Sequence, residues 1–243
     1  MHGTYDSTVD STNPFGLKLE QPARGYRYSI DAFLLAFFAS RFKGERVVEF
    51  GCGSSVISLL MAVTSPSFRE FELFEIQPEL CRYAVRNVNH NPMPGREFTV
   101  RCEDVRFAIP SVKPDLVVCN PPFRSPKSGR ISANLQRAVA RNWFFLPPSD
   151  LFASFLRMRA SNDAGLCLVL PCGNYADWEA SGKAAGLVVT DRIQVHSFPD
   201  REAALVLARF DSNGEAASVD RLILYEKNGT YTQIARKILG FIC

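Results

Sequence analysis

The sequence is poor in the residues that build metal centres and disulfide frameworks. Its 243 residues include three histidines, and its seven cysteines form no Cys-x-x-Cys pair. The apolar runs around Cys102, Cys119 and Cys167 are typical of small core residues in a reducing compartment. We therefore expect a protein without a metal ion. The three histidines fall in the N-terminal tail, in an Asn-rich turn and at a strand end, so none is a good candidate for a catalytic base.

The sequence also lacks targeting and membrane signals. No apolar run approaches the ~20 residues that a membrane helix needs, and the N-terminus has no basic stretch followed by an apolar one. We expect a cytoplasmic protein with no membrane partner. The formal net charge of +3 is too small to indicate nucleic-acid binding, but the basic residues comprise 21 Arg and 7 Lys. Arginine suits bidentate phosphate contacts and stacking on bases, which is consistent with a nucleic-acid partner, but high-GC coding also raises the share of arginine.

The order of apolar segments predicts an α/β fold. Apolar residues make up 47% of the chain, enough for the core of a single domain. Because strands alternate with helical segments, we predict a Rossmann-like, doubly wound, mostly parallel sheet of seven strands with an antiparallel hairpin at its edge. The predicted strands cover residues 46–50, 71–75, 97–101, 115–119, 165–170, 187–195 and 203–210. The predicted helices cover residues 30–42, 54–63, 78–88, 151–158 and 175–185.

The two ends of the chain receive separate predictions. Residues 1–14 are rich in Ser, Thr and Asp, and we expect them to form a mobile tail. Residues 15–243 are expected to form one domain, with a short helical addition before the first strand. After the last pair of strands, residues 219–243 are expected to add a short strand, an Asn228-Gly229 turn and a terminal helix.

A glycine loop follows the first predicted strand. Gly51 and Gly53 allow a tight turn and a close approach of the backbone to a ligand. Glu49 precedes the first glycine, where a carboxylate would repel a pyrophosphate and suits a cationic ligand such as the ammonium group of an amino acid. The third glycine of a dinucleotide fingerprint is missing, which disfavours NAD.

Acids also end the next two predicted strands. Glu75 lies where a carboxylate can accept hydrogen bonds from both hydroxyls of a ribose, and Ile76 can cover one face of an adenine. Asp104, which forms an acid pair with Glu103, can accept a hydrogen bond from the adenine amine. A surface acid pair is the alternative reading of either residue alone. Together with Glu49, the three strand ends predict S-adenosyl-L-methionine as the cofactor.

The tetrad Asn120-Pro121-Pro122-Phe123 follows the fourth predicted strand, where open α/β sheets place their chemistry. The Asn120 side-chain oxygen and the Pro121 carbonyl can each accept a hydrogen bond from a planar NH2 group. The two prolines stiffen the loop and add no competing N–H donor, and Phe123 offers a face for stacking. The alternative is a rigid turn that ends a strand.

With these motifs, the chain resembles the class I S-adenosylmethionine-dependent methyltransferases that act on amines and amides. Residues 25–36, 125–130 and 224–229 add a resemblance to the bacterial tRNA (adenine-N6)-methyltransferases that modify a valine tRNA. The resemblance implies N6 methylation of an adenine in RNA, most specifically tRNA, catalysed by the tetrad. It also implies that Ser29 and Asp31 help close over the methionine part of the cofactor; helix capping is the alternative role of both residues.

Basic residues after the tetrad are candidates for contacts with the RNA. Arg124, Lys127 and Arg130 lie in a polar segment that can grip phosphate or form a solvated lid. Asn142-Trp143 departs from the Arg-His-Glu that the tRNA enzymes usually carry at that point, which concerns the substrate more than the reaction.

Three alternative functions stay open at this point. A protein glutamine N5-methyltransferase would use the same grip, but those enzymes usually carry an N-terminal helical domain, and the segment before residue 46 is short for one. An RNA guanine-N2 methyltransferase is a second enzymatic alternative. A cofactor-binding or RNA-binding module that has lost catalysis is the non-enzymatic one.

Overall fold

A single large sheet runs through the computed structural model, which describes residues 7–10, 15–23, 27–122 and 146–240. Its strand order is β10-β8-β9-β7-β6-β3-β4-β5, and β9 is antiparallel to both of its neighbours while the other strands are parallel to one another. The strands are β3 (Arg46–Phe50), β4 (Glu70–Phe74), β5 (Glu97–Arg101), β6 (Leu116–Cys119), β7 (Gly165–Pro171), β8 (Val188–His196), β9 (Ala203–Asp211) and β10 (Val219–Ile223).

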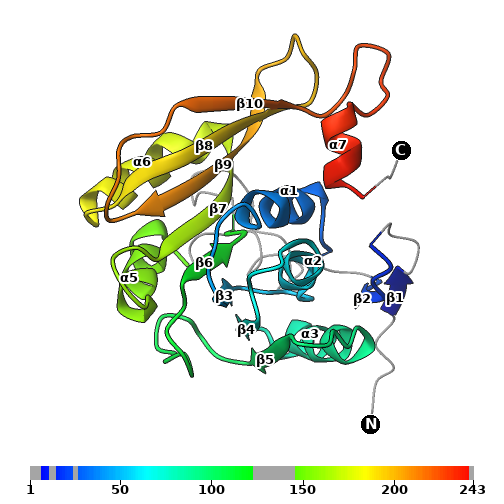
Figure 1. Cartoon of the computed structure of the whole chain (residues 1–243), viewed down its shortest axis with the longest axis vertical. Coiled ribbons are helices and arrows are strands. Elements are labelled where there is room, and N and C mark those ends of the chain that lie inside the picture. The colour runs from blue at the N-terminus through cyan, green and yellow to red at the C-terminus, as the bar shows by residue number, and fades with distance from the viewer. Residues whose placement is uncertain (1–6, 11–14, 24–26, 123–145, 241–243) are drawn as a thin grey trace.

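Helices cover both faces of this sheet (Figure 1). One face carries α1 (Ile30–Ala39), α2 (Val56–Thr64), α3 (Pro78–His90) and α7 (Gln233–Ile238). The other face carries α5 (Pro148–Met158) and α6 (Tyr175–Ala184), which follows a 3₁₀ turn at Cys172–Asn174. Neighbouring residues such as Val47 and Val48 enter opposite cores, which explains why the strands are apolar on both sides.

The predicted doubly wound α/β fold is confirmed, and the sheet is larger than expected. It has eight strands in the described residues, because β10 pairs parallel with β8 from Val219 opposite Arg192 onwards. The predicted hairpin of β8 and β9 is present, but β10 covers its outer side, so it does not form the edge. Leu222 of β10 is buried in the same core as α1, which explains why this short strand joins the sheet.

Part of the expected mobile tail is a strand. β1 (Ser7–Asp10) pairs antiparallel with β2 (Leu19–Pro22), with Ser7 opposite Pro22. All four residues of β2 are buried, so this strand is fixed by packing. The described polar residues of β1 are exposed and are held by backbone pairing and by a 2.6 Å hydrogen bond from Arg27 Nη1 to Thr8 Oγ1, which composition alone does not reveal.

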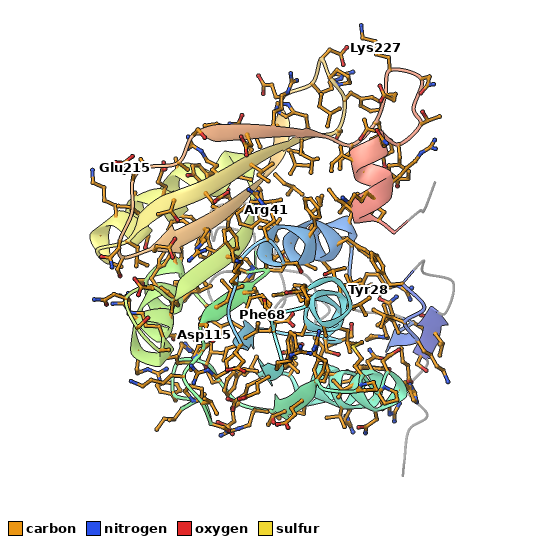
Figure 2. All side chains as sticks on the ribbon, viewed as in Figure 1. Tyr28, Arg41, Phe68, Asp115, Glu215 and Lys227 are labelled. Carbon is orange, nitrogen blue, oxygen red and sulfur yellow. The ribbon has the colours of Figure 1, made fainter. Side chains whose placement is uncertain are left out.

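The interior and the surface separate as the sequence pattern indicates. Figure 2 shows Phe68 inside the molecule, where it is fully buried, and Glu215 and Lys227 on outer loops. Across the described ranges, no helix is both long and apolar enough to cross a membrane.

The parallel strands bring four strand ends to one edge of the sheet. β3, β4, β5 and β6 are adjacent and parallel, so the residues after Phe50, Phe74, Arg101 and Cys119 lie along the same edge. This edge carries the segments that the sequence singles out.

Candidate functional site

A cleft of about 650 Å³ opens at the carboxyl ends of β3, β4, β5 and β6. Polar groups from the four strand ends line it together with apolar side chains. The lining residues are Gly51, Gly53, Phe74, Glu75, Ile76, Gln77, Leu80, Glu103, Asp104, Val105, Asn120, Pro122 and Leu146.

The glycine loop forms the floor between β3 and α2. Gly51 and Gly53 have φ values of +67° and +55°, which glycine adopts without a steric penalty. Ser55, at the start of α2, has a φ of +63° and is the only non-glycine residue with a positive φ in the described ranges. Its hydroxyl donates to Ser54 O at 2.6 Å, and its N–H donates to Cys52 O at 2.7 Å.

Glu49 is buried behind this loop rather than in the cleft wall. Its Oε2 accepts hydrogen bonds from the Ser58 hydroxyl and from Ser58 N, 3.1 Å away. Its Oε1 is buried without a hydrogen-bond partner among the described residues. Burial raises the pKa of Glu49 from 4.5 to about 8, and the nearby Glu75 carboxylate adds to the rise. A cationic ligand at the loop would therefore favour the ionised form of this carboxyl.

Glu75 lines the cleft and is oriented by backbone donors. Its Oε2 accepts from Gly53 N at 2.8 Å and its Oε1 from Gln77 N at 2.9 Å. Burial raises its pKa, and these N–H groups offset part of the rise. Each carboxylate oxygen keeps a lone pair for a ligand, such as a hydroxyl. Ile76 beside it is 45% exposed, so its side chain is available to a planar group in the cleft.

Asp104 lines the cleft but is not a free acceptor. Arg106 donates to it through Nε at 3.0 Å and through Nη2 and the backbone N–H. Burial acts to raise the pKa of Asp104, but the Arg106 contacts outweigh it and hold this pKa below its usual value. Asp104 therefore stays ionised, with its orientation fixed by Arg106. The neighbouring Glu103 pairs instead with Arg101.

The tetrad enters the cleft through two of its members. Asn120 and Pro122 line the cleft, and Pro121 between them is buried. No hydrogen bond joins the Asn120 side chain to another residue in the described part of the chain, so its amide is available to a ligand. Phe123, Arg124, Lys127 and Arg130 lie outside the described residues, as does the Asn142-Trp143 departure.

Ser29 and Asp31 are not among the residues that line the cleft. Ser29 occupies the N-cap position of α1 as expected, but its side chain makes no capping hydrogen bond to the helix. It hydrogen-bonds Asp31 instead, whose pKa burial raises. The predicted contact of both residues with the methionine part of a cofactor stays a prediction.

Several cleft residues were not anticipated from the sequence. Gln77 follows Glu75 by two residues and Val105 follows Asp104 directly, so their positions next to predicted site residues could have indicated them. Leu80 and Leu146 lie in ordinary helical or loop sequence and carry no such signal. In the described residues, no group of three or more His, Cys, Asp or Glu side chains could hold a metal ion.

Comparisons with known proteins agree with this geometry. Residues 30–142 match the family model described as the methyltransferase small domain. The chain is 26% identical over 205 residues to the tRNA1(Val) (adenine(37)-N6)-methyltransferase of Citrobacter koseri, which covers 84% of this chain and 82% of the relative. It is 24% identical over 230 residues to the enzyme of the same name from Pedobacter heparinus, covering 91% and 93% of the two chains.

A likeness to solved structures concerns the fold. The structure of a predicted O-methyltransferase from Agrobacterium tumefaciens superposes with a TM-score of 0.64 at 18% identity. The match covers 86% of this chain and 95% of the other.

Proposed function

We propose that this chain is a class I S-adenosylmethionine-dependent methyltransferase that methylates the exocyclic N6 amine of an adenine in tRNA. The observation that carries the proposal is the position of Asn120 and Pro122. They share one cleft with Glu75 and Ile76, so an amine held by the tetrad lies beside a ligand held by the second strand end. The relatives from Citrobacter koseri and Pedobacter heparinus are named tRNA1(Val) (adenine(37)-N6)-methyltransferases, which supports adenine in tRNA as the acceptor.

The cofactor is proposed to lie along the four strand ends. Gly51 and Gly53 pass beneath its methionine and ribose, Glu75 accepts the ribose hydroxyls, and Ile76 covers one face of its adenine. Asp104 would accept from the adenine amine in exchange for one of its bonds from Arg106. Glu49 stabilises the ammonium group from behind the glycine loop. Its unpartnered Oε1 and the backbone orientation of Glu75 are the features of this chain that fit such a ligand.

The tetrad then aligns the amine. An aromatic amine is a poor nucleophile because its lone pair is delocalised into the ring. Asn120 Oδ1 and the Pro121 carbonyl each accept a hydrogen bond from one N–H of the amine. These bonds favour a more tetrahedral nitrogen, with Phe123 stacked on the base. Bound S-adenosylmethionine supplies a methyl carbon that its sulfonium already activates, so alignment replaces a strong general base. Arg124, Lys127 and Arg130 are proposed to hold RNA phosphates.

The acceptor is tested by methyl transfer from tritiated S-adenosylmethionine into total tRNA, total rRNA and a peptide release factor in parallel. We expect label in tRNA, and nucleoside analysis should recover it as N6-methyladenosine. Label in the release factor alone would replace the RNA acceptor with a protein amide. Label in methylguanosine would assign the guanine-N2 reaction instead.

The role of the tetrad is tested by Asn120→Ala. Loss of one acceptor misaligns the amine, so we expect kcat/KM for tRNA to fall about 100-fold. Asn89→Ala, an exposed asparagine on α3, is the matched control and should leave kcat/KM unchanged. Asn120→Ala activity equal to the wild type would contradict this role.

A further inference from the structure

Two large apolar side chains are exposed on one short segment beside the cleft. Phe107 is 78% exposed and Ile109 is 76% exposed, the highest values among the large hydrophobic residues described. Both belong to residues 102–115, which connect β5 to β6. A single exposed apolar residue needs no explanation, but two on one segment beside a binding site indicate a contact surface.

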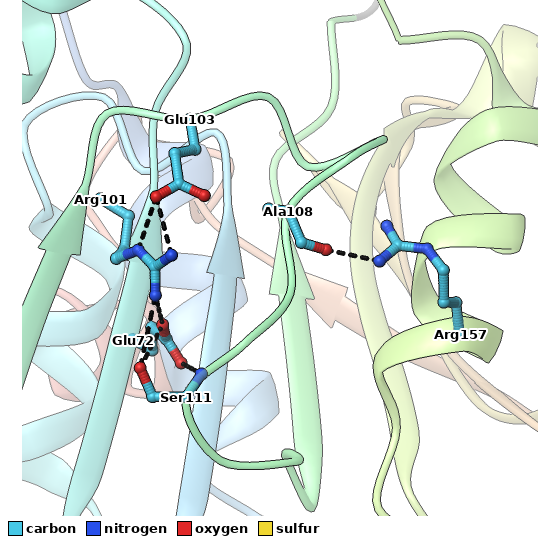
Figure 3. A network of polar contacts seen from close by, with 6 residues as sticks. All are labelled: Glu72, Arg101, Glu103, Ala108, Ser111 and Arg157. Carbon is cyan, nitrogen blue, oxygen red and sulfur yellow. Dashed lines mark hydrogen bonds and ion pairs between the residues drawn. The ribbon is translucent and has the colours of Figure 1, made fainter.

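The segment is held rigidly, so this exposure is not a loose end. Arg157 of α5 donates to the carbonyl of Ala108, as Figure 3 shows. It also donates to the carbonyls of Val105 at 2.7 Å and of Arg106 at 3.2 Å. These three guanidinium bonds, to carbonyls on both sides of Phe107, fix the backbone that carries this residue.

The far end of the segment is fixed separately. The buried Glu72 carboxylate accepts from Ser111 N at 2.8 Å and from Ser111 Oγ at 3.1 Å, and Arg101 donates to it at 3.0 Å. Figure 3 shows Arg101 between Glu72 and Glu103, on the opposite side of the segment from Arg157. Phe107 and Ile109 are therefore presented from a backbone anchored on both sides, which lowers the entropy cost of using them in binding.

Phe107 is paired with a guanidinium. Arg106 Cζ lies 5.6 Å from the centre of the Phe107 ring, within the range of a cation–π contact. The double hydrogen bond from Arg106 to Asp104 holds the guanidinium in place. An aromatic ring and an arginine plane side by side are the surfaces on which unstacked nucleobases lie in RNA complexes.

The same segment forms one wall of the cleft. Glu103, Asp104 and Val105 line it, and Asn120 and Pro122 line it from β6. Phe107 follows the cleft residue Val105 by two positions along the same anchored segment. The segment that carries Phe107 and Ile109 therefore also contributes residues to the proposed binding cleft.

The exposed area and the charge favour RNA over a second copy of this chain. Two side chains offer a few hundred Å² at most, well below the roughly 800 Å² per partner of a stable protein interface, but sufficient for one or two bases. Arg157 is exposed, and in the described residues no carboxylate pairs with it, which leaves a cation beneath the segment. A cation under an aromatic surface suits a base attached to a phosphate backbone.

We propose that Phe107, with Arg106, stacks a nucleobase that neighbours the methylated one in the RNA substrate. This inference rests on the proposed function and narrows its substrate class. A base can cover Phe107 only if it is unstacked from its own neighbours, so single-stranded RNA should bind this surface better than a duplex.

Phe107→Trp tests the stacking directly. The added indole emission should be quenched by single-stranded poly(A) and much less by a poly(A)·poly(U) duplex. Phe107→Leu keeps an apolar side chain but loses the aromatic face, and should weaken poly(A) binding roughly 5- to 100-fold, while the Kd for S-adenosylmethionine stays unchanged. KM for unfractionated tRNA should rise by a similar factor. Ile234→Ala, an exposed apolar residue on α7, is the control and should change neither value.

The outcomes separate this inference from the proposed function. Wild-type protein that labels no RNA defeats the proposed function, while poly(A) quenching still reports on Phe107. Wild-type protein that labels tRNA, with Phe107→Leu equal to it in poly(A) affinity and in KM, overturns the inference alone. A wild-type dimer in gel filtration that Phe107→Leu converts to a monomer would make the surface an interface between copies and would also overturn it.

Discussion

Ser55 in the glycine loop adopts a backbone conformation that is unfavourable for a non-glycine residue. A φ of +63° places it in the left-handed region, where a non-glycine residue costs about 1–2 kcal/mol. Its hydroxyl and N–H bonds to Ser54 O and Cys52 O hold it there, and the side chain is fully buried. Glycine would adopt the same backbone angle without this penalty.

This strain predicts an unusual order of stability at position 55. Ser55→Gly and Ser55→Ala both remove the hydroxyl, but only alanine keeps the left-handed penalty. We expect the glycine variant to be about 1 kcal/mol more stable than the alanine variant in urea unfolding. At Ser40, where φ is −67°, the same pair of substitutions should give the opposite order. The same order at both sites would show that Ser55 carries no strain.

Asp104 and Phe107 mark what a single residue in a sequence cannot reveal. The position of Asp104 after a strand correctly predicted that it lines the cleft, but not that Arg106, two residues on, occupies its carboxylate. Phe107 read as an ordinary apolar residue, because its exposure is set by how the segment is anchored to Arg157 and Glu72.

At the scale of elements, α3 joins the N-terminal segment to the glycine loop. Asn87 is fully buried; its Oδ1 accepts from Glu20 N at 2.6 Å, and its Nδ2 donates to Glu20 O at 2.8 Å and to Ser54 O at 2.9 Å. Asn91, one turn later, pairs in the same way with Lys18 N and O but has no bond to the loop. The two asparagine side chains thus pair with the backbone N–H and C=O groups of Lys18 and Glu20, as a neighbouring strand would.

This arrangement predicts different effects for two similar substitutions. Asn87→Ala leaves buried backbone groups unpaired and should cost about 2–3 kcal/mol in urea unfolding. It also frees Ser54 O, so binding of S-adenosylmethionine should weaken roughly tenfold, as expected for one misdirected hydrogen bond. Asn91→Ala should cost similar stability and leave the cofactor Kd unchanged. Equal cofactor affinities for the two variants in calorimetry would argue against a role of α3 in positioning the loop.

Elements themselves were predictable where a local pattern decides them. The helix starting at Pro78 has proline at its first position and an apolar stripe, and it extends only two residues beyond its predicted end. β1 was not predicted, since its polar residues gain their structure from backbone pairing with β2. The addition of β10 to the sheet depends likewise on a contact with β8 that no local pattern encodes.

For the molecule as a whole, buried acids make folding stability depend on pH. Glu49 and Glu75 both lie near the glycine loop, and burial raises the pKa of each. For Glu49 the pKa is about 8 in the folded chain, against 4.5 without the burial. Between these values the unfolded chain has released a proton that the folded chain keeps. The contribution of Glu49 to the free energy of unfolding is therefore greatest below pH 4.5 and decreases as the pH rises towards 8.

Glu49→Gln should remove this dependence. Glutamine keeps the shape and the acceptor for Ser58 but does not ionise, so its unfolding free energy should vary less between pH 5 and 8 than that of the wild type, by a few kcal/mol in total. Chemical denaturation at a series of pH values measures this difference. Thr99→Ser, an exposed change on β5, serves as the control and should keep the wild-type slope. Parallel pH curves for Glu49→Gln and wild type would place the Glu49 pKa near its ordinary value.

The sequence by itself determined the fold class and the order in which the candidate site residues follow the strands, and it predicted the reaction that we propose. Alternating apolar runs specify a parallel sheet, and a parallel sheet brings all its carboxyl ends to one edge. The glycine loop, Glu75, Asp104 and the start of the tetrad therefore had to lie along that edge, and they line one cleft there.

Only the tertiary structure decided which of these groups are free to act. It places Glu49 behind the loop, pairs Asp104 with Arg106, leaves Asn120 without a partner in the described residues, and exposes Phe107 on an anchored segment. Strand ends are fixed by local patterns, but burial and hydrogen bonding depend on contacts between residues distant in the chain, such as Arg157 with Val105.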